Sequence, residues 1–143
     1  MSNQKLNKLK SDLEGNLLSA GSAFAIEMFD GEYAVLKITV EGREELPIYM
    51  TADENHILCI SYLWSEQEVD QGKRIELLET LLKLNVTIPL SAFSKIHNQY
   101  ILFGSLSPDS SVKDLLREIE VLSDNTLDAI EAVSDYLNGG LKP

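Results

Sequence analysis

The side chains best suited to catalysis in this sequence are few and stand apart from one another. His56 and His97 are its two histidines, and Cys59 is its one cysteine. Neither histidine has a second histidine or a cysteine at the spacing of a metal site, and one cysteine cannot build a zinc site. Cys59 lies in an apolar run typical of a strand interior, where cysteine packs as a small hydrophobe and does not act as a nucleophile. We therefore predict no catalytic residue, no metal and no cofactor.

Paired carboxylates are the next candidates for chemistry, because general acid–base catalysis often uses two of them. Glu44-Glu45 and Asp53-Glu54 both fall in predicted turns, where carboxylates are ordinarily hydrated. The sequence contains none of the glycine-rich, zinc-protease or serine-hydrolase motifs that would place such groups in a site. A small-ligand-binding domain, or an enzyme using carboxylates in an unrecognised pocket, is the alternative that these pairs leave open.

Charge narrows the classes of partner. The 143 residues carry 12 basic and 23 acidic side chains, a formal net charge of −11. This field repels phosphate backbones, so we expect no nucleic-acid binding. No apolar run approaches the length of a membrane span, and the first residues lack the apolar core of a signal peptide. The sequence therefore predicts a cytoplasmic protein without an integral membrane segment.

In the first half of the chain, leucines every three or four residues predict a helix over 3–18 that docks on a sheet. Lysines on its polar face leave a membrane-surface role as an alternative. Asp30-Gly31 between two β-favouring runs indicates a hairpin. Turn residues then divide the region into a meander of antiparallel strands, over 24–29, 33–40, 48–51 and 56–63.

The second half is predicted to begin with a capped turn over 65–68 and a leucine-rich helix from Lys73 to Asn85. Apolar residues cover well over half of that helix, so we expect it to be buried by its own sheet and by another helix or a second subunit. An extended pair, 91–96 and 100–106, should close over it. A long helix follows over 112–137, in which 123–125 is a candidate kink.

Together these elements predict one α+β domain over 1–143, with a frayed tail at 138–143. Its order is α-β-β-β-β-α-β-β-α, with an antiparallel sheet and helices. Three large aromatic residues, Tyr62, Trp64 and Phe93, lie near a strand end or the helix–sheet junction. Aromatic side chains supply much of the energy at protein interfaces, so these residues are candidates for partner binding. The alternative is that they fill the core.

The order of elements resembles that of two groups, the small acidic chaperones of type III secretion and the YbjN-like proteins. Locally, the likeness lies in the leucine-rich run 77–85, the link through Pro89 to Ala92-Phe93, and the run 100–103. The whole chain is most similar to the YjfI-like family, bacterial proteins of unknown function. That similarity rests on three short segments, Met50-Thr51, Leu84-Asn85-Val86 through Pro89-Leu90-Ser91-Ala92-Phe93, and Leu127-Asp128-Ala129-Ile130.

The resemblance implies a protein-binding domain and not an enzyme. YjfI-like proteins are often encoded near proteins similar to the phage-shock protein PspA, which suggests a partner in envelope stress. Secretion chaperones typically form dimers, so a homodimer is a second implication. We therefore expect an acidic, cytoplasmic interaction module that is chaperone-like or regulatory, with a PspA-like protein as its candidate partner.

Overall fold

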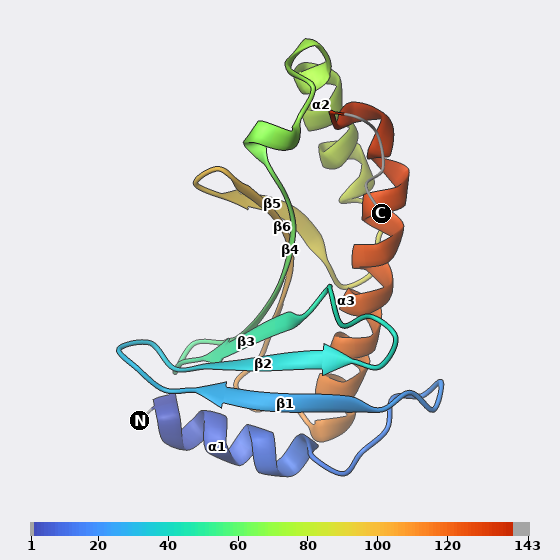
Figure 1. Cartoon of the computed structure of the whole chain (residues 1–143). Coiled ribbons are helices and arrows are strands. Elements are labelled where there is room, and N and C mark those ends of the chain that lie inside the picture. The colour runs from blue at the N-terminus through green and yellow to red at the C-terminus, as the bar shows by residue number, and fades with distance from the viewer. Residues whose placement is uncertain (1, 139–143) are drawn as a thin grey trace.

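The computed structural model describes residues 2–138, and the whole chain is drawn in Figure 1. The predicted α+β class and order of elements are confirmed. Each predicted strand is present, with ends within two residues of those expected. The main elements are α1 (Ser2–Leu13), β1 (Phe24–Phe29), β2 (Val35–Val40), β3 (Ile48–Ala52), β4 (Ile57–Ser65), α2 (Arg74–Leu84), β5 (Ala92–Ile96), β6 (Gln99–Leu106) and α3 (Val112–Ala132).

The strands form one six-stranded antiparallel sheet in the order β1-β2-β3-β4-β6-β5. The first four strands are the predicted meander, each paired with the next along the chain. β6 returns beside β4, which places β5 at the far edge. Figure 1 shows the sheet bending, with α1 and α3 outside the bend.

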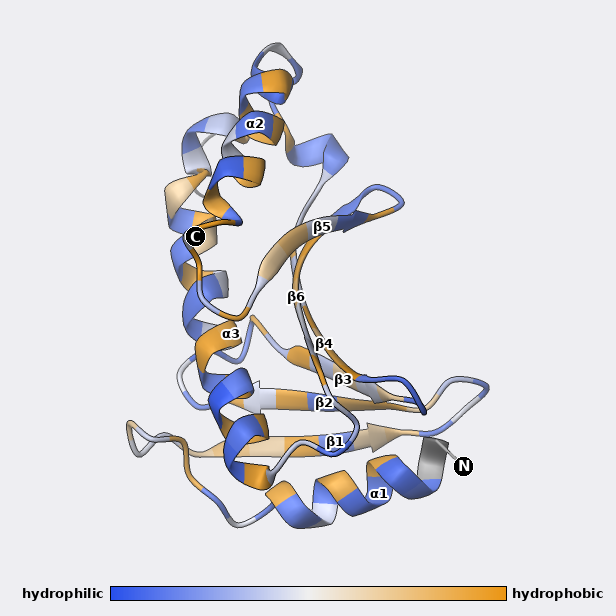
Figure 2. Ribbon diagram, turned by 180° about the vertical axis from the view of Figure 1, so that it is seen from behind, coloured by the Kyte–Doolittle hydropathy of each residue, from blue (hydrophilic) through white to orange (hydrophobic). Residues whose placement is uncertain are grey.

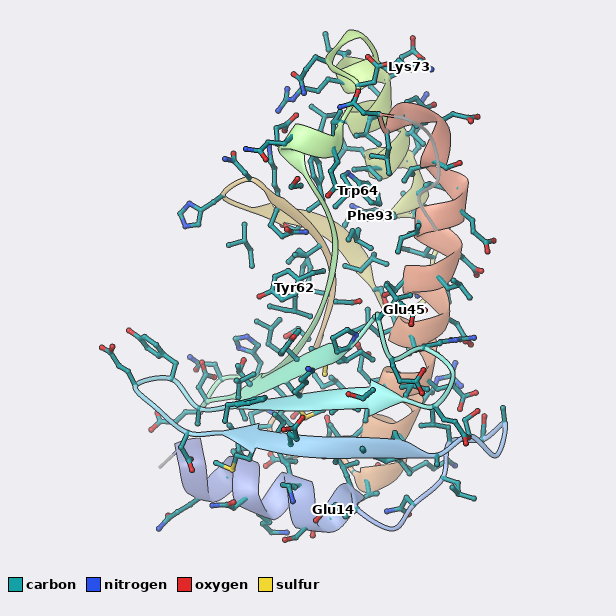
Figure 3. The ribbon with its side chains drawn as sticks, viewed as in Figure 1. Glu14, Glu45, Tyr62, Trp64, Lys73 and Phe93 are labelled. Carbon is teal, nitrogen blue, oxygen red and sulfur yellow. The ribbon has the colours of Figure 1, made fainter. Side chains whose placement is uncertain are left out.

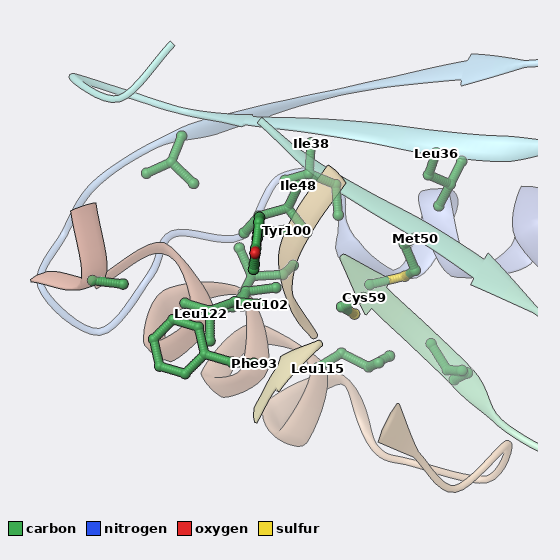
Figure 4. Close-up of a cluster of buried hydrophobic side chains, with 14 of the residues drawn as sticks. Leu36, Ile38, Ile48, Met50, Cys59, Phe93, Tyr100, Leu102, Leu115 and Leu122 are labelled. Carbon is green, nitrogen blue, oxygen red and sulfur yellow. The ribbon is translucent and has the colours of Figure 1, made fainter. Parts of the chain in front are cut away.

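One face of the sheet carries the core. Along β2 and β3 every second side chain is buried, as alternation on a pleated strand requires. These side chains meet leucines of α1 and α3, and part of the cluster is drawn in Figure 4. The largest fully buried members include Leu36, Ile38, Met50, Leu102 and Leu115. Both long helices therefore lie on the same side of the sheet.

α1 is shorter than predicted. Leu6, Leu9 and Leu13 are buried against the sheet, as their spacing indicates, but the helix ends at Leu13 and not near residue 18. Gly15 has φ +86°, a left-handed conformation that glycine adopts without steric cost and that ends the helix early. Because its leucine stripe is covered, the face that a membrane-surface helix would insert is already occupied.

α3 is continuous across the candidate kink, from Val112 to Ala132. Ser111 caps it, with its Oγ accepting a hydrogen bond from the N–H of Asp114 at 3.1 Å. The predicted end at 137 is wrong, since the α-helix stops at Ala132 and residues Ser134–Tyr136 form a 3₁₀ turn. Within the described residues no helix is both long and apolar enough to cross a membrane.

Within the single chain α2 is covered on one side only, whereas we expected its own sheet and another helix or a second subunit to bury it. Leu77 and Leu81 are buried, but Ile75 and Leu82 are 77% and 69% exposed. The pair β5–β6 does not close over α2; it extends the sheet beyond β4 instead. Figure 1 shows α2 beyond the end of the sheet, beside the last turns of α3. Asn85 ends α2 as predicted, and its side-chain oxygen accepts the N–H of Phe93 at 2.6 Å.

A C-terminal clamp, Val133–Asn138, fixes the approach to α2. Val69 and Leu137 form an antiparallel bridge, and the N–H of Asp70 donates to the carbonyl of Tyr136 at 2.9 Å. The N–H of Asn138 donates to the carbonyl of Glu68 at 2.7 Å. Asn138, the first residue of the predicted frayed tail, is therefore held; residues 139–143 lie outside the described residues.

Candidate functional site

The three aromatic residues singled out from the sequence lie on two sides of the sheet. Tyr62 is 46% exposed, whereas Trp64 is 3% and Phe93 is 9% exposed. Figure 3 shows Trp64 and Phe93 on the side of α3 and Tyr62 on the opposite side. A register shift between Tyr62 and Ser65 in β4 changes the local pairing with β6 here. Of the three, Tyr62 is the one that a partner can reach, and Trp64 and Phe93 belong to the core.

Tyr62 belongs to the face of the sheet that α1 and α3 leave uncovered. Side chains on this face range from the buried Ile101 to the exposed Glu27 and Tyr62, and they fall in register from strand to strand. One row crosses all six strands: Glu27, Lys37, Tyr49, Ile60, Phe103 and Ala92. A second row pairs Tyr62 with Ile101. We call the apolar centre of this surface, Tyr49, Ile60, Tyr62, Ile101 and Phe103, the open face.

The open face combines aromatic rings with aliphatic side chains. Tyr49 and Tyr62 meet edge to face, with ring centroids 5.5 Å apart and an interplanar angle of 63°. Ile101 beside them is 4% exposed, because the bent sheet shelters its middle. Thr51 and Ser105 lie in register with Leu58 on the same side and add hydroxyl groups at the margin. Such a surface can bind apolar side chains and offers no paired acid and base for catalysis.

A network around Glu66 fixes the end of β4 behind the open face. The Glu66 carboxylate accepts hydrogen bonds from Arg74 Nε at 3.0 Å, from Tyr100 Oη at 2.9 Å, and from Lys95 Nζ and Gln71 Nε2. Arg74, then Lys95 and Gln71, hold the pKa of Glu66 well below its usual range. A carboxylate so fully engaged ties α2 to β5 and β6, and it is not available as a general base.

Two aromatic rings connect that network to the core. Trp64 stacks on Tyr100 with centroids 5.7 Å apart, and Lys95 Nζ lies 4.9 Å from the centroid of the Tyr100 ring. Burial, followed by the hydrogen bond to Glu66, raises the pKa of Tyr100 to about 12. The phenol therefore remains protonated at neutral pH and acts as a hydrogen-bond donor.

Glu118 is the unusual acid of the molecule. It lies in the first half of α3, is 2% exposed, and its Oε2 has no hydrogen-bond partner among the described residues. Its carboxylate packs against Gly104 of β6, where an added Cβ would come within 1.9 Å of Oε2. Burial raises the pKa of Glu118 to about 7. Burial, together with the field of Glu118, raises the pKa of Cys59 far above its usual range, so this thiol is inert.

The two histidines, the sequence's candidates for catalysis or metal binding, lie apart from each other. The structure places His56 beside Asp53, with 3.6 Å between Nδ1 and Oδ1, and places His97 in the β5–β6 turn. Hydrogen bonds from the backbone N–H groups of His56 and Asn55 lower the pKa of Asp53. Across residues 2–138 no three His, Cys, Asp or Glu side chains gather in a way that could hold a metal ion.

Two surface depressions lie away from the open face. The larger, about 890 Å³, runs between α1 and two turns, and its lining includes Lys5, Lys8, Asp53 and Asp109. The smaller, about 200 Å³, is bordered by Arg43 and Glu120. Neither is lined by Glu118, so the buried acid does not face either cavity.

Sequence reasoning missed most of the open face and all of the Glu66 network. The run Ile57–Ile60 is apolar at every position, a pattern that indicates apolar side chains on both sides of β4. Nothing in that run indicates which side the helices leave bare. The burial of Glu118 could have been predicted from the sequence, because it lies three residues after Leu115 and four before Leu122, within the apolar stripe of α3.

Comparisons with known proteins identify a family, and the names of its members do not state an activity. Residues 3–137 match the model of a family described as "Uncharacterized protein conserved in bacteria (DUF2170)". Two relatives, each called "Uncharacterized protein YjfI", come from Escherichia coli strain K12 and from Escherichia coli O157:H7. Each is 42% identical over 60 residues, which cover 39% of this chain and 45% of the relative. Since the family model spans nearly all the described residues, the chain belongs to this family of uncharacterised, YjfI-like bacterial proteins.

Proposed function

We propose that this protein is a non-enzymatic interaction module that binds a helix of a protein partner on its open face. The observation that carries the proposal is the row Tyr49–Ile60–Phe103, with exposed Tyr62 beside it, on a side of the sheet that α1 and α3 leave bare. Tyrosine is well suited to such a surface because it adds a large contact area at little cost in conformational entropy.

A helix fits this surface better than an added strand does. The central strands β3, β4 and β6 each have neighbours on both sides, so an added strand would find no free backbone edge at the open face. Binding there must use side chains. An amphipathic helix offers an apolar stripe to Tyr49, Ile60 and Phe103, while its polar side remains in water.

We propose that the partner is a PspA-like protein of the bacterial envelope-stress response. The two proteins would meet in the cytoplasm or at the membrane surface. YjfI-like proteins, which this chain resembles, are often encoded near such proteins. The absence of paired acids and bases at the open face favours binding over catalysis. The role of the module would then be that of a regulatory or chaperone-like partner.

The test is binding of a purified PspA-like protein from the same bacterium, measured by calorimetry with the full chain. We expect Tyr62→Asp to abolish binding, because it sets a charge in the centre of the contact. Leu17→Asp is the matched control, since Leu17 is 58% exposed in the segment between α1 and β1. Loss with Tyr62→Asp alone supports both partner and surface.

The same pair of variants tests the surface without assuming the partner. Each tagged protein is used to capture proteins from native lysate, and stoichiometric partners are identified by mass spectrometry. A partner lost with Tyr62→Asp and kept with Leu17→Asp supports the open face. A partner kept by both overturns this surface, and capture of nothing by wild type overturns the interaction module.

A further inference from the structure

α2 has two apolar sides, and one of them is bare. Leu77 and Leu81 face inward and are 0% and 5% exposed. On the outward side lie Ile75 and Leu82, 77% and 69% exposed, with Leu78 half-buried between them. Figure 2 shows hydrophobic residues recurring along this helix. A bare apolar stripe of this size on a surface helix marks a contact surface.

The spacing of the outward residues selects the kind of partner. Ile75, Leu78, Leu82 and Val86 follow at steps of three, four and four. Val86 continues the helical path, because its N–H donates to the carbonyl of Lys83 at 3.4 Å, and it is 87% exposed. These steps average about 3.7 residues, close to the 3.6 residues of one helical turn, so the four side chains stay on one side of the helix and can form a seam with a second helix. We call these four residues the outer stripe.

Charged residues lie along one flank of the outer stripe. Glu79 and Lys83 are exposed, and the side chain of neither forms a hydrogen bond or ion pair with another described residue. The other flank is already engaged, since Arg74 pairs with Glu66 and Asn85 binds the N–H of Phe93. The free charges are therefore confined to one side of the seam.

This pattern complements itself when two copies of the helix run antiparallel. A two-fold axis near the middle of α2 sets Leu78 opposite Leu82 of a second copy, and Ile75 opposite Val86. Antiparallel helices bring the same flanks together, so Glu79 of each copy lies beside Lys83 of the other. In a parallel pair, Glu79 and Lys83 would instead face the flank of Arg74 and Asn85, whose side chains already have partners within the chain. An anionic membrane would be repelled by Glu76 and Glu79.

We propose that a second copy of this chain docks antiparallel on α2, through the outer stripe and two reciprocal Glu79–Lys83 pairs. The surface is distinct from the open face, so the proposal does not depend on how that face is used. The two-fold axis makes each apolar contact, Leu78 with Leu82 and Ile75 with Val86, occur twice in the dimer, as in any self-complementary interface. A three-turn seam is smaller than a standard interface of about 800 Å² per partner, and we expect a dissociation constant in the micromolar range.

The first experiment is sedimentation equilibrium of the full chain at concentrations up to about 200 µM. This range includes the dissociation constants expected of so small an interface. We expect reversible dimers, and Leu82→Glu should raise the dissociation constant on the order of a hundredfold, because two leucines lose their burial. Leu17→Glu is the matched control and should leave it unchanged. A monomer at every concentration overturns the proposal, leaving the stripe for a helix of another protein. A dimer unchanged by Leu82→Glu overturns it too.

The second experiment tests the antiparallel register. Glu79→Lys and Lys83→Glu should each weaken the dimer, by about tenfold, since each turns two attractive pairs into repulsive ones. The double variant restores both pairs with their signs exchanged and should recover the wild-type constant. Circular dichroism shows that each variant is folded. A double variant no tighter than the single ones overturns the reciprocal pairing, whatever the behaviour of partner binding at Tyr62.

Discussion

The two faces of the sheet are made from the same strands and differ in what covers them. Met50 of β3 is fully buried on the covered face, while its neighbour Tyr49 is only half-buried on the open one. Along β4, likewise, Cys59 is buried on the covered face and its neighbour Ile60 is half-buried on the open one. Both faces are apolar in the middle, so the hydrophobicity of a strand does not determine whether it is covered. The placement of α1 and α3 does, and substitutions on the two faces should therefore have different effects.

The largest effect is expected on the covered face at Trp64. Trp64→Ala should lower the free energy of unfolding by about 3–5 kcal/mol, because it empties a buried site and removes the stack on Tyr100. Urea denaturation followed by tyrosine fluorescence or circular dichroism measures it. A loss below about 1 kcal/mol would show that Trp64 is not packed as described.

The next effect is pH-dependent and comes from Glu118. Its pKa is raised to about 7 in the folded state, so the native chain binds the proton more tightly than the unfolded chain does. This group therefore lowers stability as pH rises from about 4.5 to about 7, with a loss of about 3 kcal/mol above that range. Glu118→Gln removes that dependence.

The measurement is urea denaturation of wild type and Glu118→Gln at several pH values. The stability of the variant relative to wild type should rise across this interval and remain constant above it. Acids whose pKa is lowered, such as Glu66, act in the opposite direction in both proteins and cancel in the difference. A difference that does not vary with pH would contradict the burial of this acid.

A smaller effect is expected from Gly104→Ala on the same covered face. The new Cβ would come within 1.9 Å of Glu118 Oε2, so the carboxylate must move within a packed core. We expect a loss of about 1–3 kcal/mol in the free energy of unfolding. Adding Glu118→Ala frees this space, so in a double-mutant cycle the two changes should cost less together than the sum of the single losses. Strict additivity would show that the close approach is not what costs stability.

The smallest effect on stability is expected on the open face. Tyr62→Ala should change the free energy of unfolding by no more than about 1 kcal/mol, since the ring is 46% exposed and its loss opens no internal cavity. Urea denaturation measures the change beside that of Trp64→Ala. A loss as large as that for Trp64→Ala would show that Tyr62 is a core residue and that the open face is covered in solution.

Local patterns in the sequence were sufficient for the elements and their order. The leucines at 6, 9 and 13 define one stripe, and Asp30-Gly31 marks the hairpin between β1 and β2, whose loop spans residues 30–34. Helix ends were less certain, because Gly15 ends α1 while leucine spacing alone continues to Leu17. The apolar content of α2 predicts burial, but Ile75 and Leu82 face water in the single chain, because apolar content alone does not report which element or subunit covers a helix.

The site was predictable only in part. Tyr62 and Trp64 are two residues apart, and strict alternation would place them on one face, but the irregular register of β4 separates them. No local pattern reports that irregularity. The Glu66 network joins residues that are far apart in the sequence, so it exists only once the 3₁₀ turns after β4 have met α2, β5 and β6.

The C-terminal clamp has a consequence for synthesis on the ribosome. α2 leaves the exit tunnel about fifty residues before Tyr136 and Leu137, which pair with the segment ahead of it. A bacterial ribosome adds about 5–20 residues per second, so this interval lasts seconds. Until it ends, Leu77 and Leu81 lack the covering that Val133–Asn138 and α3 provide. We therefore expect Leu77 and Leu81 to be exposed on the nascent chain, together with Ile75 and Leu82, until α3 and the C-terminal clamp have been synthesised.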